Sequence, residues 1–219
     1  MNIMLKVKTV IVGAYSVNCY IVYCTETMDG ILVDPGDEAK RIKYFADDLG
    51  VSIKEIVLTH AHSDHIGAVN ELKEYFDVKV ALYADENDVY SNSAMNLTDI
   101  MAEYPISENG DILLNNGDYV MFGNEKLEVL HTPGHTKGSI CLYGGGNLFS
   151  GDTLFAGTYG RIDFPTGDER LLAGSLLKIM QLPEDTVIYP GHYESTILNT
   201  EKRYNRMALR LIEEYYDKT

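Results

Sequence analysis

Three of the six histidines in this 219-residue chain fall within one short run, His-Ala-His-Ser-Asp-His at residues 60–65. The run directly follows Ile-Val-Leu at residues 56–58, an apolar segment that we expect to end a β-strand. In an extended backbone, alternate side chains point to the same side and lie about 6.5 Å apart along the strand. His60 and His62 can therefore reach one cation, and the adjacent Asp64 and His65 are left to diverge toward another. The run indicates half of a two-metal centre.

An apolar run that ends at a turn with a ligand-capable side chain occurs three more times. These runs cover residues 127–130, 147–149 and 186–189, and they lead to His135, Asp152 and His192. Each turn contains glycine, and two of them contain proline, residues that end strands because of their unusual dihedrals or missing N–H donor. Functional groups in open α/β sheets collect beyond the carboxyl ends of strands. We therefore expect the four strand ends to converge on one site.

If the strand ends converge in this way, the seven candidate ligands form two sets, one for each metal. The first metal is expected to be held by His60, His62, His135 and Asp152, and the second by Asp64, His65 and His192. Asp152 has two oxygens and can bridge the two metals. Asp64, which we also assign as the catalytic carboxylate, lies near the start of an expected helix, where negative charge is favoured. His131 is expected to be a structural residue or an outer partner of a ligand.

Nitrogen and oxygen ligands alone suit zinc, iron or manganese, so the expected cofactor is two divalent metal ions, with zinc as the default. A single histidine after a strand is more often a hydrogen-bonded surface or core residue than a ligand. Four ligand-capable side chains within six residues, however, have no evident packing reason. The pattern as a whole therefore predicts a metal site more strongly than any of its parts.

The ligand pattern resembles that of the metallo-β-lactamase superfamily, in which His-x-His-x-Asp-His is followed by separate His, Asp and His ligands. The upstream Val33-Asp34-Pro35-Gly36 resembles the family's first motif, whose Asp orients the ligand loop, although a plain turn fits equally well. The resemblance covers nearly the whole chain. It implies an α/β fold of the αβ/βα type, a sandwich of two mixed β-sheets flanked by helices, with residues 1–219 forming a single domain.

Within that superfamily, residues 132–136, 150–155 and 160–161 look most like the glyoxalase II branch. That resemblance implies hydrolysis of a thioester by a metal-bridging hydroxide, with Arg161 and Tyr193 as substrate-binding residues. Three departures point instead to the short glyoxalase II-like hydrolases. Asp163 replaces an expected aromatic residue, Tyr193 comes one position early, and only residues 199–219 follow the last ligand region, where glyoxalase II has a basic helical extension.

Other functions remain open from the sequence. Residues 160–164 also resemble persulfide dioxygenases, which use one iron, and a lactonase would need a wide apolar mouth that the sequence does not reveal. β-Lactamases usually have Cys, or no bridging carboxylate, at the position of Asp152, so the resemblance does not imply β-lactam hydrolysis. A metal-holding scaffold without turnover is disfavoured because every candidate ligand is present.

The charge balance disfavours a nucleic-acid partner. Lys and Arg number 18 against 33 Asp and Glu, a net charge of -15, whereas nucleic-acid binding requires a basic footprint. No apolar run approaches the roughly 20 residues of a membrane span, and residues 1–12 alternate like a first strand rather than a signal peptide. We therefore expect a small-molecule substrate and no membrane partner, while the oligomeric state is not indicated.

The three cysteines are predicted to be buried thiols. Cys19 and Cys24 would lie about 16 Å apart in an extended strand, beyond the roughly 7 Å that a disulfide allows between Cα atoms. An unpaired odd set fits a reducing compartment, most simply the cytoplasm.

The remaining pattern predicts alternating strands and helices. Residues 84–110 are expected to be irregular, either as a rim over the site or as a surface excursion, and the helix at the end of the chain should bury Met207, Leu211 and Tyr215. The expected strands are 5–12, 17–24, 31–33, 53–58 and 79–83, and the expected helices are 38–49, 66–76, 168–181 and 202–216.

Overall fold

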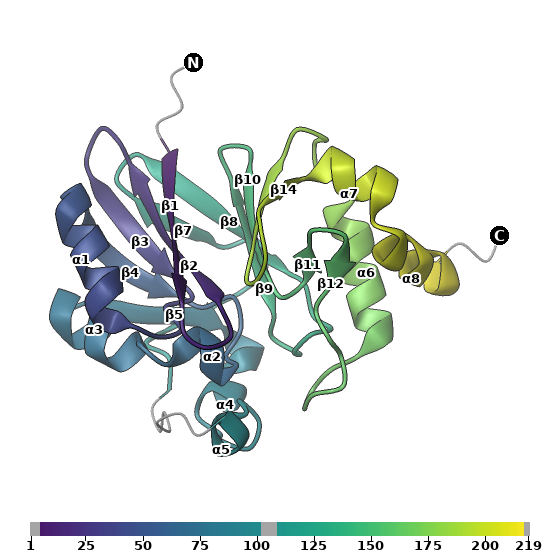
Figure 1. Cartoon of the computed structure of the whole chain (residues 1–219), viewed down its shortest axis with the longest axis horizontal. Coiled ribbons are helices and arrows are strands. Elements are labelled where there is room, and N and C mark those ends of the chain that lie inside the picture. Colours follow the sequence, from purple (N-terminus) through teal and green to yellow (C-terminus); the bar gives the residue numbers. More distant parts are fainter. Residues whose placement is uncertain (1–4, 102–108, 217–219) are drawn as a thin grey trace.

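Two six-stranded sheets pack face to face in the computed structural model, which describes residues 5–101 and 109–216 (Figure 1). In the first sheet, the three initial strands are antiparallel and the next three run parallel to one another. Its strands, in spatial order, are β1 (Leu5–Val12), β2 (Val17–Cys24), β3 (Asp29–Val33), β4 (Ser52–Val57), β5 (Lys79–Tyr83) and β6 (Ile112–Leu114).

The second sheet is antiparallel except where β10 pairs with β13. A separate hairpin of β11 (Leu154–Phe155) and β12 (Thr158–Tyr159) follows β10. The strands of the second sheet, in spatial order, are β14 (Thr196–Ile197), β13 (Val187–Pro190), β10 (Asn147–Gly151), β9 (Ile140–Gly144), β8 (Glu125–His131) and β7 (Tyr119–Phe122).

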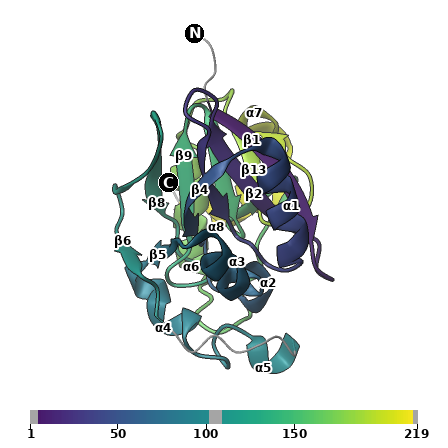
Figure 2. The same cartoon turned by 90° about the vertical axis from the view of Figure 1, so that its left-hand side faces the viewer.

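Helices cover the outer face of each sheet, so central strands such as β2, β3 and β10 are buried on both faces. Helices α1 (Ala39–Leu49) and α3 (Val69–Phe76) pack on the first sheet, on the side that faces the viewer in Figure 2. Helices α6 (Glu169–Ile179) and α8 (Arg206–Tyr216) pack on the second. Three apolar clusters result, and adjacent residues of one strand serve different clusters: Ile56 packs under the helices and Val57 between the sheets.

The predicted two-sheet fold flanked by helices is confirmed, and β1, β2 and β5 have the predicted bounds. The predicted helix over 66–76 is wrong in detail, because it is split into α2 (Ser63–Ile66) and α3. The cause is long-range, since the backbone N–H of Ala68 donates to the Pro35 carbonyl at 3.0 Å instead of continuing the helix.

The segment 84–110 is more regular than predicted over its described part. It contains a 3₁₀ turn, η1 (Ala84–Glu86), and the short helices α4 (Asn87–Tyr90) and α5 (Thr98–Met101), while residues 102–108 lie outside the described residues. The three cysteines are buried and unpaired, as predicted. No helix within 5–101 or 109–216 is long and apolar enough to cross a membrane.

The predicted helix over 202–216 is also interrupted, at Asn205, which separates α7 (Leu198–Tyr204) from α8. The buried Asn205 amide donates to the carbonyls of Phe155 and Thr158 in the β11–β12 hairpin, and its oxygen accepts the N–H of Ala208. Met207 lies in the first turn of α8, directly after this break, and is 53% exposed, contrary to the prediction, whereas Leu211, one turn later, is buried.

Replacing Asn205 tests whether this side chain anchors the hairpin. Asn205→Ala removes a helix cap and leaves buried carbonyls without donors, so we expect the free energy of unfolding to fall by about 2–3 kcal/mol. Asn205→Asp is the matched variant, because it keeps the cap acceptor but loses the donors to the hairpin. Urea denaturation of both variants measures the difference, and equal stability of wild type and Asn205→Ala would contradict the anchoring role.

Candidate metal centre

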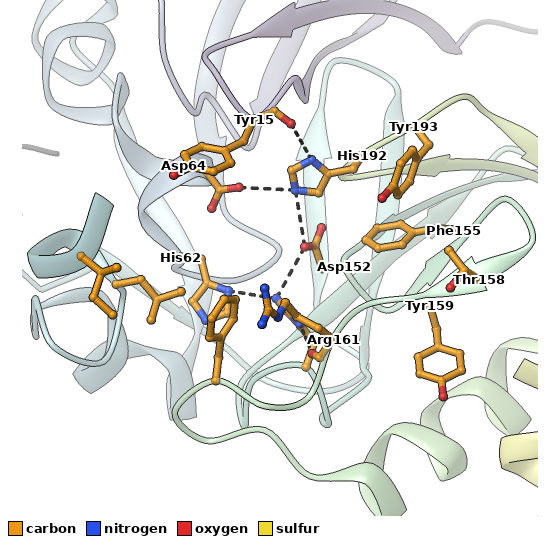
Figure 3. Close-up of a pocket in the computed structure, with 14 residues that line it drawn as sticks. Tyr15, His62, Asp64, Asp152, Phe155, Thr158, Tyr159, Arg161, His192 and Tyr193 are labelled. Carbon is orange, nitrogen blue, oxygen red and sulfur yellow. Dashed lines mark hydrogen bonds and ion pairs between the residues drawn. The ribbon is translucent and has the colours of Figure 1, made fainter. Parts of the chain in front are cut away.

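The four strand ends converge on one site, as predicted. His60 and His62 follow β4, while His135, Asp152 and His192 follow β8, β10 and β13. Figure 3 shows His62, Asp152 and His192 around the site. The positions come from both sheets, so the site lies where the two sheets meet at one end of the sandwich. All seven candidate ligands predicted from the sequence lie together there.

Ligand-capable atoms form three compact groups within the described residues, and two of these groups correspond to the predicted sets. His60, His62 and His135 offer three nitrogens that all lie within 4.8 Å of one another, and Asp64, His65 and His192 meet the same criterion. These groups match the two predicted sets apart from Asp152. A third group, Asp34 with His60 and His65, also qualifies by distance.

Asp152 lies between the two groups. Its Oδ2 is 3.5 Å from His135 Nε2 and 3.6 Å from His192 Nε2, and its Oδ1 is 3.5 Å from His65 Nε2. One carboxylate therefore faces ligand nitrogens of both groups, as a bridging residue must.

Partners outside the site fix the orientation of three imidazoles. Each ring uses Nδ1 to donate: His135 to the carbonyl of Arg161 at 2.6 Å, and His192 to the carbonyl of Tyr15 at 3.1 Å. His65 Nδ1 donates in the same way to a carboxylate oxygen of Asp34, at 3.1 Å. This arrangement turns Nε2 of all three rings toward the site, where it is the nitrogen available to a metal.

Several atoms in the site are satisfied only if a cation is bound. His60 Nε2, His62 Nε2 and Asp152 Oδ1 are buried without a hydrogen-bond partner. The Nε2 atoms of His65 and His192 face each other at 3.4 Å. A buried polar atom without a partner costs about 1–3 kcal/mol, and a cation between these atoms would remove that cost. The residues therefore fit divalent metals held by nitrogen and oxygen.

The electrostatics of the two groups differ. Burial, reinforced by the neighbouring imidazoles, holds the pKa values of His60 and His62 well below the usual range, so both rings are neutral. Burial also disfavours charge on His65, but the carboxylates of Asp152, Asp64 and Asp34 together raise its pKa to about 10. The three carboxylates around His65 thus favour positive charge in the second group, and they would attract a metal cation for the same reason.

Asp34 is an outer support of the site rather than a free ligand. Its two oxygens accept the backbone N–H of Thr59 at 2.7 Å and the Thr59 hydroxyl at 2.6 Å, in addition to His65. The family resemblance implied that Asp34 orients the ligand loop, with a plain turn as the alternative, and these contacts agree with the orienting role. Gly36 completes the support, because a Cβ at this position would collide with the backbone carbonyl of Asp64.

Glu86, a fully buried carboxylate, joins the two ligand loops and was missed in the sequence. Its Oε1 accepts the N–H of Ala61, between two ligand histidines, at 2.9 Å. Its Oε2 accepts the Thr136 hydroxyl at 2.8 Å and the Gly138 N–H at 3.0 Å, in the loop that carries His135. Burial raises the pKa of Glu86 to about 7, against the effect of these bonds. The available signal was its place just after strand 79–83, in a segment treated as irregular.

The other predicted residues have clear positions. Arg161 and Tyr193 both line a cavity of about 540 Å³ beside the ligands. The Arg161 guanidinium, however, forms a bidentate ion pair with Asp163, at 2.7 and 2.6 Å, and both side chains are mostly exposed. His131 lies outside the ligand groups, where it stacks on Tyr83 at 4.1 Å and contacts the carbonyl of Lys137.

The sequence is similar to a known superfamily and to curated proteins. The family model of the metallo-β-lactamase superfamily matches residues 12–192. The hydroxyacylglutathione hydrolase GloC of Haemophilus influenzae is 31% identical over 214 residues, which cover 92% of this chain and 97% of the relative. A hydroxyacylglutathione hydrolase of Aeromonas salmonicida is 34% identical over 174 residues, covering 80% of this chain but 60% of that longer protein.

Solved proteins with different names share the fold. The B3 metallo-β-lactamase BLEG-1 has a TM-score of 0.87 at 32% identity, covering 92% of this chain and 98% of its own. TTHA1623, solved in a di-iron-bound form, has a TM-score of 0.82 at 35% identity and covers 91% and 98%. ETHE1 from Myxococcus xanthus has a TM-score of 0.80 at 28% identity and covers 97% and 88%. The substrate must therefore be argued from the site itself.

A variant of Glu86 tests its role as the link between the ligand loops. Glu86→Gln turns one acceptor oxygen into a donor that faces a buried N–H or hydroxyl, so we expect the free energy of unfolding to fall by about 1–3 kcal/mol. Metal affinity should fall as well, because the loops lose their common anchor. Urea denaturation of the metal-free protein and chelator competition measure the two effects. Asp85→Asn, the same change at an exposed neighbour, is the control and should alter neither.

A second variant tests Asp152 as the shared ligand. Asp152→Ala should lower the metal content from two equivalents to one or fewer and abolish turnover, because one carboxylate serves both groups. Elemental analysis of the purified protein gives the metal content. His131→Ala is the control, since it removes an imidazole outside both groups and should keep the metal. Two equivalents of metal in Asp152→Ala, with normal turnover, would exclude the bridging role.

Proposed function

This chain belongs to the metallo-β-lactamase superfamily, and we propose that it is a hydrolase of thioesters that uses two divalent cations, zinc by default. One observation carries the proposal. Asp152 faces ligand nitrogens of two separate groups, and several of the surrounding atoms are buried without any other partner. A site for a single metal would not need both groups. The proposed substrate is a small molecule, for which the cavity of about 540 Å³ has a suitable size.

Bound metals at such a site lower the pKa of water and polarise a carbonyl. His60, His62 and His135 would hold one metal, and Asp64, His65 and His192 would hold the other. Hydrolysis joins the water oxygen to the acyl carbon and breaks the carbon–sulfur bond, and the electron pair leaves with sulfur. A thiolate is a good leaving group, so the reaction needs no separate general acid.

The thioester assignment draws on similarity to GloC, which covers nearly the full length of both chains. Two other activities have specific support. ETHE1 resembles this chain at 28% identity, in keeping with the persulfide dioxygenase alternative, although the complete second group favours two metals over one iron. BLEG-1 makes β-lactam hydrolysis a candidate despite Asp152. The lactonase alternative requires an apolar mouth, and the pocket has several aromatic residues.

A substrate panel, run on one protein preparation that is divided and loaded with different metals, separates these activities. The metal-free protein is loaded with zinc, manganese or ferrous iron and assayed with S-lactoylglutathione, a chromogenic cephalosporin and an acyl lactone, and oxygen uptake is followed with glutathione persulfide. Thioester hydrolysis that needs two equivalents of metal supports the proposal. Oxygen uptake with one iron, or cleavage of the β-lactam or lactone alone, overturns it.

Variants of the exposed ion pair test how the site treats an anionic thiol carrier. Arg161→Ala should raise KM for S-lactoylglutathione less than about fivefold and leave kcat nearly unchanged, because exposed ion pairs contribute little and this one is already formed within the chain. Asp163→Ala frees the guanidinium and should change KM in the opposite direction. Steady-state kinetics of both variants provide the test. Tight saturation by wild type at micromolar substrate would show a glutathione pocket and contradict this expectation.

A further inference from the structure

Apolar side chains stand on two sides of the metal centre, next to the ligands themselves. Phe155 packs edge-on against His192, with ring centroids 6.0 Å apart, and Phe164 packs edge-on against His62 at 5.6 Å. His62 and Phe155 lie on opposite sides of the site in Figure 3. A group attached to the reacting carbonyl would therefore meet aromatic carbon on either side of the ligands.

These two sides continue outward as walls of the cavity. On one side Tyr193 packs on Phe155 at 5.4 Å and is 67% exposed, so it extends the wall to the surface. We call the first set the Tyr193 wall, made of Phe155, Tyr159 and Tyr193. The second set, the Leu97 wall, is made of Leu97, Ile100 and Phe164. Its members lie on the side of His62, because Phe164 packs on that ring and the Ser63 N–H donates to the carbonyl of Asn96, next to Leu97. Exposed apolar side chains gathered at a cavity mouth indicate a binding surface.

The backbone is strained at one residue in each wall. Leu97 and Tyr193 have φ values of 69° and 67°, in the left-handed region that bulky residues rarely adopt. Buried asparagines fix both segments: Asn18 donates to the Tyr193 carbonyl at 2.7 Å, and the Asn96 side chain accepts the N–H of Thr98 at 3.0 Å. Strain of this kind persists where the surroundings impose it, and it concentrates at ligand sites.

The charges around the cavity disfavour an anionic substrate. Among the described residues that line it, Arg161 is the one with a permanent positive charge, and Asp163 already neutralises it. The chain as a whole carries a net charge of -15, which repels anions at long range. Beyond the metals themselves, recognition must therefore rest on apolar contact.

We propose that the substrate carries an apolar, uncharged acyl group, which lies between the Tyr193 wall and the Leu97 wall while the carbonyl faces the ligands. This inference rests on the proposed thioester hydrolysis and specifies its substrate class. A small polar acyl group such as lactoyl fills neither wall. Activity on S-lactoylglutathione is then a side reaction of a site shaped for longer acyl chains.

A chain-length series tests the inference by turnover. The substrates are acetyl, butanoyl, hexanoyl and octanoyl thioesters of N-acetylcysteamine, a neutral thiol, and thiol release is measured on the zinc-loaded protein. Full burial of one methylene corresponds to about fourfold in affinity, so in a partly open pocket we expect about twofold in kcat/KM per methylene. The octanoyl thioester should then be preferred to the acetyl thioester by about 30- to 100-fold.

A binding series gives a readout that does not depend on turnover. Acetate, butanoate, hexanoate and octanoate present the same chains without a scissile bond, and calorimetry on the zinc-loaded protein gives their Kd values. Kd should fall with chain length in parallel with kcat/KM. Flat profiles in both series overturn the inference and leave the proposed function intact. Steeply falling Kd values without hydrolysis of any thioester overturn the proposed function instead.

Variants assign the preference to the walls. Tyr193→Gly suits the left-handed backbone and loses a mostly exposed ring, so it should fold at least as well as wild type while the octanoyl preference falls about tenfold. Ile100→Ala shortens a side chain of the Leu97 wall that is 78% exposed and keeps a residue that favours helix, so it should also fold and should lower the preference similarly. Met28→Gly is the matched control, because Met28 has a φ of 57° but lies in the β2–β3 turn, away from the cavity. An unchanged preference in both wall variants would exclude the walls as the chain-binding surface.

Discussion

The hydrogen bonds of two buried carboxylates hold the loops on which the site depends. Asp34 fixes the start of the loop after β4 through Thr59 and orients the ring of His65. Glu86 fixes the same loop through Ala61 and joins it to the loop that carries His135. Each oxygen is satisfied by donors that the fold supplies, which offsets the cost of burying a charge. Without them, the ligand nitrogens would not be held close together.

Stability and function make opposite demands at this end of the sandwich. The sheets below the site are filled with apolar side chains, whereas the site itself buries nitrogens and oxygens that only a cation satisfies. Strained residues, among them Asp34, Leu97 and Tyr193, also gather at this end. Buried polar atoms without partners and strained backbone residues are tolerated here because the packed sheets and helices around them impose these conformations. Their concentration marks the part of the molecule that is shaped for a ligand.

The relation between the metal centre and the cavity explains how relatives with the same fold can have different names and activities. The ligands follow strand ends, where the fold fixes their positions, but the cavity walls come from the β11–β12 hairpin and from segments after β5 and β13. None of the six residues that form the two walls is itself a candidate ligand, so these side chains can change while the ligands stay the same. Specificity therefore resides in the walls, and similarity in the ligands alone does not define a substrate.

The sequence alone determined which side chains gather, because apolar strands ending in turns place the following residues at one edge of a sheet. It predicted the seven candidate ligands and most strands. It could not show that Asp163 neutralises Arg161, that Glu86 joins two loops, or that Asn205 breaks the last helix. Apart from the Arg161 pair, these contacts join residues about 25 to 50 positions apart, and they depend on how the sheets and helices pack. Tertiary structure therefore decided how the site is supported and what surrounds it.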